Sequence, residues 1–501
     1  MDPRLTTDTL AQLRGVNAAS NLVKAWLNPT GPTTGIQNYD LEKPALSLVP
    51  VLTPLFNRIP IVGAKGGIQA NWRAVTGINT AGLSPGLSAG ARGGYVTTAT
   101  ADYYAVYRQF GLDGLVQEEA EFAAEDYEDV LALSQLELVL ALKIAMEKVY
   151  LGGQGTYAIG QCTAPTLAGA TTGGTLATQT LSVKVAGLTL DGYLNGSVAN
   201  GVPGQVARTN ADGTTTTYGG GTGQLSSNTT AAITGPTGSC TASTPALTGA
   251  VAYAWFWGAS GSEVLGAITT INSILITAAA AGTQTAASLS ATDWSQNAYV
   301  CDGLIAQICK SGFNGYVAQQ TTGTAGTGTP LTADGDGGIV EIDADLKYFY
   351  DNFRLSPSRI MVSSQEQTNI SKKIGQGPGS GTSNLRFMRD ATNGQLVGAV
   401  IARAYLNRYT AGLSGGPSAG MEIPIELHPN LPPGTILYET DKLPYPASNV
   451  ANVLQFRARK NFYATLWPKV TRQWSHGVYM DGVLQNYFIP AFGMRTNIGN
   501  G

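Results

Sequence analysis

The sequence predicts an α+β fold into which an all-β domain is inserted. Three stretches of the 501-residue chain lead to this prediction. Two strand-like segments flank a glycine-rich stretch at residues 77–94, a leucine-rich helical segment spans residues 118–151, and a region rich in threonine, glycine and alanine spans residues 155–289. The strand-like segments contain many Thr, Tyr and Val residues, apolar residues alternate in the third stretch, and they recur with a helical period in the second, so strands and helices are both expected.

An extended arm is expected over residues 1–66. Six prolines fall between positions 29 and 60, and proline fixes φ and donates no backbone hydrogen bond. We expect the arm to run over a surface after one short helix at residues 6–13. The polar start predicts no signal peptide, and the longest apolar runs are too short to span a membrane.

A long hairpin is expected next, with strands at residues 69–76 and 95–108 that contain many Thr, Tyr and Val residues. A lone two-stranded hairpin is marginally stable in water, and its free edges invite pairing. We therefore expect the hairpin to lie across another subunit. The residues expected to make contacts between subunits, on the hairpin and at the start of the following helix, are Trp72, Arg73, Arg92, Tyr103, Tyr104, Arg108, Glu118, Glu119 and Glu121.

One long helix is predicted over residues 118–151, entered through the GLDG segment at residues 111–114. At ~1.5 Å per residue it would be about 50 Å long. Its first half is acidic and its last turns carry lysines, which suits the helix dipole. Leu131, Leu138, Leu142 and Val149 fall on one side, and Leu133, Leu136, Leu140, Ile144 and Leu151 nearly opposite. Two apolar faces indicate a helix covered from both sides, although the central helix of an ordinary large domain fits the spacing equally well.

An immunoglobulin-like β-sandwich is predicted over residues 154–290. Only five charged residues occur between positions 155 and 289, and short alternating segments there are separated by turn signals such as residues 210–213. Trp255 and Trp257 lie in one such segment. We favour their packing in the core of the sandwich, because large aromatic residues are mostly buried; stacking on sugars is the alternative.

The chain after the insertion is expected to alternate between helices and strands. Helices are predicted at residues 300–310, 339–353 and 364–374, the last with Ser364 as its N-cap. Strands are predicted at residues 359–363, which should be buried, and at 396–408, 423–427 and 435–438. Loops are expected at residues 311–330 and from residue 375 onward. The C-terminal residues read as aromatic β-strands.

Composition favours a protein that is largely covered by partners. Charged residues make up 13% of the chain, about half the usual share. The net charge of −3 excludes a broad basic face for nucleic acid. The four cysteines have no metal-type spacing and are expected to be reduced thiols, with a Cys162–Cys240 bridge only under oxidising conditions.

Patterns that suggest an enzyme or a metal site are weak. The esterase pattern G-x-S-x-G occurs at Ser84, Ser88, Ser414 and Ser418, but a nucleophile elbow needs a strand, a helix and a histidine partner, whereas all four lie in glycine-rich loops. Asp334, Asp336 and Glu341 depart from the EF-hand pattern and predict a solvated turn. We expect no catalytic residue, no cofactor and no metal.

Three segments, in this order, resemble the major capsid proteins of tailed bacteriophages, the family with the Hong Kong 97 fold. They are residues 118–130 (EEAEFAAEDYEDV), 353–364 (FRLSPSRIMVSS) and 474–487 (WSHGVYMDGVLQNY). The resemblance covers the chain outside the inserted region. It implies an N-arm at 1–66, an E-loop at 67–112, the spine helix of a P domain at 113–153, the insertion at 154–290, a connection at 291–334, an A domain at 335–450 and C-terminal P-domain strands at 451–501.

The resemblance also implies a function and partners. Hexamers and pentamers of the chain would close into an icosahedral head around double-stranded DNA, which the inner face would contact nonspecifically. A portal, a scaffolding protein and a decoration protein are partners that it allows. The subunit would belong to the virion, assemble in the bacterial cytoplasm and need no membrane. The alternative is a phage surface or tail protein whose sandwich binds carbohydrate.

Covalent cross-linking between subunits is not expected. Some members of the family join an E-loop lysine to an asparagine of a neighbour, whereas residues 67–112 contain no lysine. Subunits should therefore migrate intact on reducing, denaturing gels, and a ladder of multimers would contradict this. The segment before the hairpin is too short for the cleaved scaffolding domain of some members, so no N-terminal proteolysis is expected, and scaffolding would be separate or absent.

Overall fold

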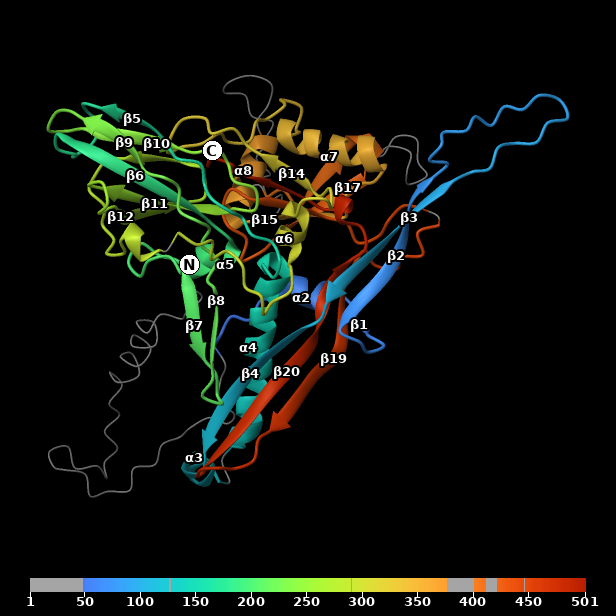
Figure 1. The fold of residues 1–501 in the computed structure, drawn as a ribbon, viewed down its shortest axis with the longest axis horizontal. Coiled ribbons are helices and arrows are strands. Elements are labelled where there is room, and N and C mark those ends of the chain that lie inside the picture. The colour runs from blue at the N-terminus through green and yellow to red at the C-terminus, as the bar shows by residue number, and fades with distance from the viewer. Residues whose placement is uncertain (1–47, 126–127, 290, 376–400, 411–420, 446) are drawn as a thin grey trace, which may run out of the picture. The chain divides into compact units, whose positions relative to one another are not determined.

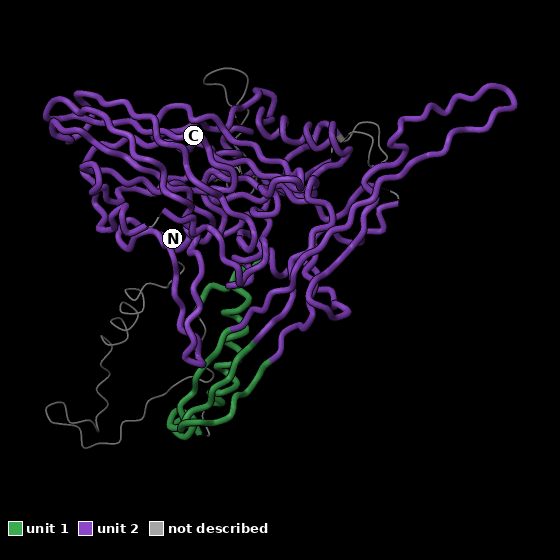
Figure 2. The backbone as a smooth tube through the Cα atoms, viewed as in Figure 1, with its two compact units in different colours: residues 1–53, 112–144, 464–478 green, residues 54–111, 145–463, 479–501 purple. Residues whose placement is uncertain are grey.

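The computed structural model describes most of the chain (Figure 1). The described residues are 48–125, 128–289, 291–375, 401–410, 421–445 and 447–501. The backbone forms two compact units (Figure 2), of which the first comprises residues 1–53, 112–144 and 464–478 and the second residues 54–111, 145–463 and 479–501. The predicted helix at 6–13, most of the predicted arm and most of the loop after residue 375 lie outside the described residues.

The predicted single helix is two helices. α3 (Glu118–Ala123) ends before an acidic stretch, and α4 (Val130–Gly152) begins after it. Asp129 starts α4 because its Oδ1 accepts a hydrogen bond from the Ala132 N–H at 3.0 Å, as an N-cap residue does. With 23 residues, α4 is about 35 Å long rather than 50 Å. The prediction of one continuous helix was wrong because apolar spacing does not reveal this cap.

The GLDG segment, expected as the entry to the long helix, lies within a strand. β4 (Arg108–Gln117) runs straight through it. A Cβ atom on Gly111 would lie 2.1 Å from the Tyr479 ring, and one on Gly114 would lie 2.9 Å from Leu138. These glycines therefore serve close packing rather than a turn. β4 is an end strand of a four-stranded sheet, in the order β1-β19-β20-β4, with β1 (Ile61–Gly63), β19 (Leu454–Leu466) and β20 (Gln473–Asn486).

The predicted hairpin is confirmed. β2 (Gln69–Ile78) and β3 (Thr98–Val106) pair antiparallel, from Gln69 opposite Val106 to Ile78 opposite Thr98. The two strands form a sheet of their own, visible at the blue end of the colour scale in Figure 1. The glycine-rich residues between them contain no strand.

The inserted region contains two antiparallel sheets. One has the order β13-β10-β5, with β5 (Thr166–Ala170), β10 (Ser239–Ser243) and β13 (Ser273–Ile276). The other has the order β12-β11-β6-β9, with β6 (Gln179–Leu188), β9 (Thr229–Ile233), β11 (Ala252–Gly258) and β12 (Val264–Thr269). Side chains of both sheets share one core, which includes Val183, Trp255, Cys240 and Ile276. The immunoglobulin-like assignment and the domain boundaries stay predictions.

Two smaller parts complete this region. β7 (Gln205–Thr209) and β8 (Thr215–Gly219) form a two-stranded hairpin around the predicted turn at 210–213. α5 (Leu190–Asn195) follows β6, with the Thr189 hydroxyl accepting the Gly192 N–H. The buried Asn272 N–H then donates to Asn497 Oδ1 at 2.7 Å, which ties this region to the C-terminal residues.

A six-stranded mixed sheet forms the other large core. Its order is β14-β21-β18-β15-β17-β16, with β14 (Tyr316–Gln319), β15 (Arg359–Val362), β16 (Ala404–Asn407), β17 (Met421–Leu427), β18 (Ile436–Glu439) and β21 (Gly493–Thr496). The helices of this part are α6 (Leu304–Cys309), α7 (Val340–Phe353) and α8 (Ser364–Ile374). The predicted buried strand is confirmed as β15.

Two predictions in this part were wrong. Residues 311–330 were expected to be loop, yet β14 lies within them and pairs in parallel with β21, a partner far away in sequence. The N-cap of α8 is Ser363 and not Ser364, because the Ser363 hydroxyl accepts the Glu366 N–H at 3.3 Å. In the part of the chain that the structure describes, no helix is both long and apolar enough to cross a membrane.

All four cysteines are free and buried. Burial raises the pKa of the Cys162, Cys301 and Cys309 thiols to about 12 each. Because the thiolate is the reactive form, these side chains behave as small apolar core residues at neutral pH.

Candidate subunit interface

The hairpin exposes apolar side chains that no described residue covers. Ile78 is 77% exposed and Tyr104 is 68% exposed. Other exposed apolar side chains of this segment are Ile68, Val75, Leu83, Leu87, Tyr95, Val96 and Val106. β2 and β3 pair only with each other among the described strands, so neither edge of the hairpin is covered by a further described strand. Apolar groups gathered on a thin two-stranded element are typical of a surface that binds a partner.

The base of the hairpin is anchored on its own chain. The Trp72 ring stacks on Tyr103, with centroids 5.9 Å apart, and meets Tyr487 edge-on at 5.8 Å. Such aromatic pairs stabilise a cross-strand contact. The structure thus brings Trp72 and Tyr103 together, and a role for them between subunits stays a prediction.

An ion pair fixes the register of the two strands. Arg73 Nε lies 2.6 Å from Asp102 Oδ1, and Arg73 Nη2 lies 2.8 Å from Asp102 Oδ2, across directly opposed positions. The hydrogen bond with Asp102 raises the pKa of Arg73, and the same contact lowers the pKa of Asp102. Both side chains are exposed, so solvent screens the pair and its effect is mainly on geometry. Arg92 is exposed at the tip, and Arg108 is half-buried at the start of β4.

Two acidic residues of α3 contact side chains in and beside the turn between β19 and β20. Glu118 forms ion pairs with Lys469 and with Arg472, the latter at 3.3 Å, and these contacts lower its pKa. Glu121 accepts a hydrogen bond from the Trp474 indole at 2.6 Å. Glu119 is exposed. Two of the three predicted contact carboxylates therefore have partners within the chain, while a role in assembly stays a prediction for all three.

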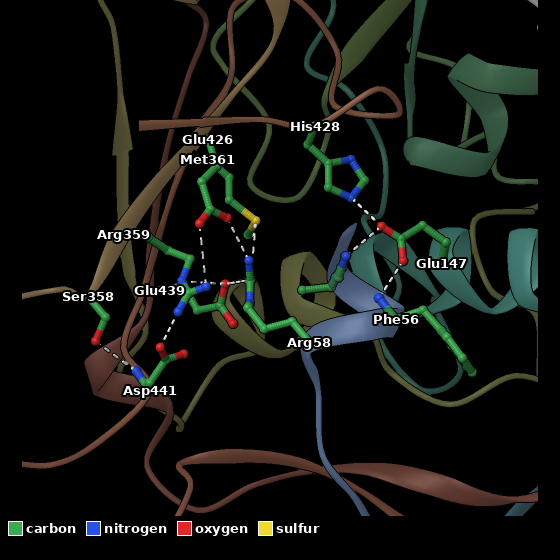
Figure 3. A network of polar contacts seen from close by, with 11 residues as sticks. Phe56, Arg58, Glu147, Ser358, Arg359, Met361, Glu426, His428, Glu439 and Asp441 are labelled. Carbon is green, nitrogen blue, oxygen red and sulfur yellow. Dashed lines mark hydrogen bonds and ion pairs between the residues drawn. The ribbon is translucent and has the colours of Figure 1, made fainter. Parts of the chain in front are cut away.

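A buried carboxylate, which the sequence did not single out, contacts the segment that precedes the hairpin (Figure 3). Glu147 of α4 accepts the backbone N–H groups of Leu55 and Phe56 at 2.9 and 2.6 Å. His428 Nε2 lies 2.8 Å from the same carboxylate. The side chain of a distant helix thereby supplies the hydrogen-bond acceptor for free backbone N–H groups in the first turn of the short helix α2 (Pro54–Arg58). The leucine-rich half of the predicted helix contains two carboxylates, Glu137 and Glu147, and nothing in the local sequence distinguishes the buried one.

The two histidines of the chain are engaged in structural contacts. His428 bonds to Glu147, and His476 Nε2 lies 3.1 Å from the Ser134 hydroxyl. Ser84 and Ser88 are exposed in the hairpin tip. Ser414 and Ser418 lie outside the described residues.

The predicted acidic turn is closed by its own backbone. Asp334 Oδ1 accepts the N–H groups of Asp336 and Gly338 at 2.8 and 2.7 Å, and Arg408 binds Oδ2 at 2.8 Å. Glu341 accepts the Thr332 N–H at 2.8 Å. Among the described side chains, no three His, Cys, Asp or Glu residues gather in a way that could hold a metal ion.

The two tryptophans of the sandwich are core residues. Trp255 is 0% exposed and Trp257 is 6% exposed. Their indole N–H groups donate to Thr269 Oγ1 at 2.8 Å and to the Ala278 carbonyl at 3.0 Å. The preferred hypothesis of core packing is confirmed, and the alternative of sugar stacking by these rings is wrong because their faces are covered.

Because the Trp257 ring packs directly on Gly266, we expect a side chain at position 266 to destabilise the fold. A Cβ atom on Gly266 would lie 2.0 Å from the Trp257 ring. We expect Gly266→Ala to lower the free energy of unfolding by about 1–3 kcal/mol, as overpacking a core does, measured as a shift of the denaturation midpoint. Gly86→Ala is the control, because its Cβ would meet nothing nearer than 3.8 Å. Equal stability of the two variants would mean that the ring can leave the core.

Comparison with known proteins returns similarities at the level of structure. No protein-family model and no curated protein matches the chain. Similar solved structures include one from Mycobacterium phage Ogopogo, with 10% identity, a TM-score of 0.37 and coverage of 92% of this chain and 96% of that chain. The capsid of Myoviridae Phage XM1 has 9% identity, a TM-score of 0.38 and coverage of 93% and 100%. The capsid of a native GTA particle has 8% identity, a TM-score of 0.39 and coverage of 95% and 100%.

Two of these structures are capsids.

Proposed function

We propose that the chain is the major capsid protein of a tailed double-stranded DNA bacteriophage. Copies would form hexamers and pentamers that close into an icosahedral head around the genome. The observation that carries this proposal is the β2–β3 hairpin, which forms a separate sheet and exposes apolar side chains along its length. The ordered sequence segments that resemble phage capsid proteins support the same conclusion.

Assembly by overlap explains why such a hairpin is stable enough to persist. Its apolar residues lose their contact with water only when a neighbouring copy covers them, so folding of the hairpin and association reinforce each other. Each subunit would both give and receive such a contact, and many modest contacts add up through multivalency. The low share of charged residues limits repulsion between copies.

The finer assignments belong to this proposal. Residues 67–112 would be the E-loop, 113–153 the spine segment of a P domain, 335–450 an A domain and 154–290 an inserted immunoglobulin-like domain. The subunit would have no enzymatic activity, would contact DNA nonspecifically on its inner face and would assemble in the bacterial cytoplasm. A portal, a scaffolding protein and a decoration protein would be its partners in the virion.

Negative-stain electron microscopy of the purified full chain tests the proposal, combined with light scattering after size-exclusion chromatography. We expect closed shells, sheets or hexamer rings. A protein that stays monomeric up to high micromolar concentration would overturn the proposal. The alternative of a carbohydrate-binding surface protein has lost its main support, because Trp255 and Trp257 are buried.

A further inference from the structure

A short segment connects the core of the second unit to the hairpin. It begins with α2, continues through Ile59 and Pro60 into β1, and reaches β2 at Gln69. Backbone hydrogen bonds hold it along β19: the Phe456 N–H donates to the Pro60 carbonyl at 2.9 Å, and the Ala64 N–H donates to the Ala458 carbonyl at 2.8 Å. The position of this segment therefore fixes where the hairpin leaves the core.

A cluster of charged side chains holds the end of α2 on the six-stranded sheet (Figure 3). Arg58, the last residue of α2, forms ion pairs with Glu426 of β17 at 2.7 Å and with Glu439 of β18. Arg359 of β15 forms an ion pair with Asp441, and its Nε lies 3.9 Å from Glu439. Glu439 is central to the cluster, because both arginines approach it and its side chain is only 3% exposed.

The cluster holds more negative than positive charge. Within the ion pairs of the cluster, two guanidinium groups face three carboxylates, so one carboxylate has no guanidinium group of its own when all five are ionised. Beside it lies a cavity of ≈170 Å³ whose lining includes Arg58, Ile59, Pro60, Glu439 and Lys442. A polar cavity of this volume has room for several water molecules. Water and protons can therefore reach Glu439 from the side on which the hairpin segment lies.

We propose that Glu439 is a proton-operated latch on the base of the hairpin. With a proton bound, Glu439 balances the charges of the cluster and keeps Arg58, Pro60 and β1 packed on the core. When the proton leaves through the cavity, a charge appears on the buried Glu439 carboxylate, and the segment that lines the cavity loosens to hydrate it. This latch concerns the single subunit and does not depend on the proposed function.

The direction of the pH effect follows from the position of Glu439. Burial raises its pKa from 4.5 to about 7, with Asp441 and Glu426 acting in the same direction and Arg58 and Arg359 opposing them. The folded state thus binds this proton more tightly than the unfolded state. The resulting stabilisation is fully present below about pH 4.5 and is lost as the pH rises through about 7.

Hydrogen exchange measured by mass spectrometry on unassembled full-length subunits tests the latch. Between pH 6 and pH 8.5, after correction for the intrinsic exchange rate, we expect protection in peptides covering residues 55–63 to fall by about tenfold. Peptides covering β11 should keep their protection. Unchanged protection of residues 55–63 in the wild-type chain would overturn the proposal, whether or not the chain forms shells.

Three variants sharpen the test. Glu439→Gln should show the high protection of the acidic form at both pH values. Asp441→Asn removes a neighbouring carboxylate and should move the transition to lower pH, which keeps the latch testable if Glu439→Gln fails to fold. Glu422→Gln, an exposed glutamate on β17, is the matched control and should behave like the wild type. A transition unmoved in Asp441→Asn, or still present in Glu439→Gln, would contradict the role of Glu439.

Discussion

A subunit with a shortened hairpin should fold but form no shells. Thr80 and Thr97 face each other across the hairpin, with a backbone hydrogen bond of 3.2 Å and hydroxyl groups 2.8 Å apart. Replacing residues 81–96 by Asn-Gly would close the hairpin at this pair, since that dipeptide favours two-residue β-turns. The change removes Leu83, Leu87, Tyr95 and Val96, which are exposed, so the folded subunit loses little while the contact with a neighbour is lost.

Electron microscopy and light scattering would compare the shortened chain with the wild type, and circular dichroism would compare their thermal unfolding. The double variant Ser84→Ala, Ser88→Ala is the control, because it keeps the length and the apolar residues of the tip. It should form shells at wild-type yield. Shells of normal yield from the shortened chain would show that the tip is not part of the subunit interface.

Glu147→Ala should weaken the attachment of α2 by about 3–5 kcal/mol. The substitution leaves the N–H groups of Leu55 and Phe56 and the ring of His428 without their acceptor in a buried site. Removing one partner of a buried charged network typically has a cost of this size, because the remaining polar groups cannot regain water. Native-state hydrogen exchange of residues 55–59 would report the loss as a lower free energy of local opening.

Two further variants show what the loss at Glu147 means. Glu137→Ala, an exposed position on the same helix, should change stability by no more than about 0.5 kcal/mol. Glu147→Gln keeps one carbonyl oxygen as an acceptor and should fall between the two alanine variants. If Glu147→Ala behaved like Glu137→Ala, the carboxylate would not be what holds α2.

Elements with strong local patterns could be predicted from the sequence. The hairpin strands are rich in Thr, Tyr and Val, α7 repeats apolar residues at helical spacing, β15 is a short apolar run, and the burial of the two tryptophans of β11 follows from the general burial of large aromatic residues. Glycine was harder to interpret. Gly111 and Gly114 were expected only as the entry to the long helix, whereas they allow Tyr479 and Leu138 to pack closely against β4.

Features that depend on distant partners could not be predicted from local patterns. β14 is a strand because it pairs with β21. The polar side chains that gather around α2, namely Arg58, Glu147, Arg359, Glu426 and Glu439, come from α2, α4, β15, β17 and β18. Only the complete fold brings them together. Glu118 and Glu121, two of the predicted contact residues, bind Lys469 and Trp474, which lie 351 and 353 residues further along the chain. Nothing in the local sequence indicates these partners.

The burial of all four cysteines makes the native chain well suited to site-specific labelling. With thiol pKa values raised by burial, maleimide reagents at neutral pH should find almost no thiolate to attack in the folded protein. A single cysteine introduced in place of Ser84 or Arg92 would then be the one reactive position. Fluorophores or spin labels attached there would report distances between hairpins of neighbouring copies without first removing any native cysteine.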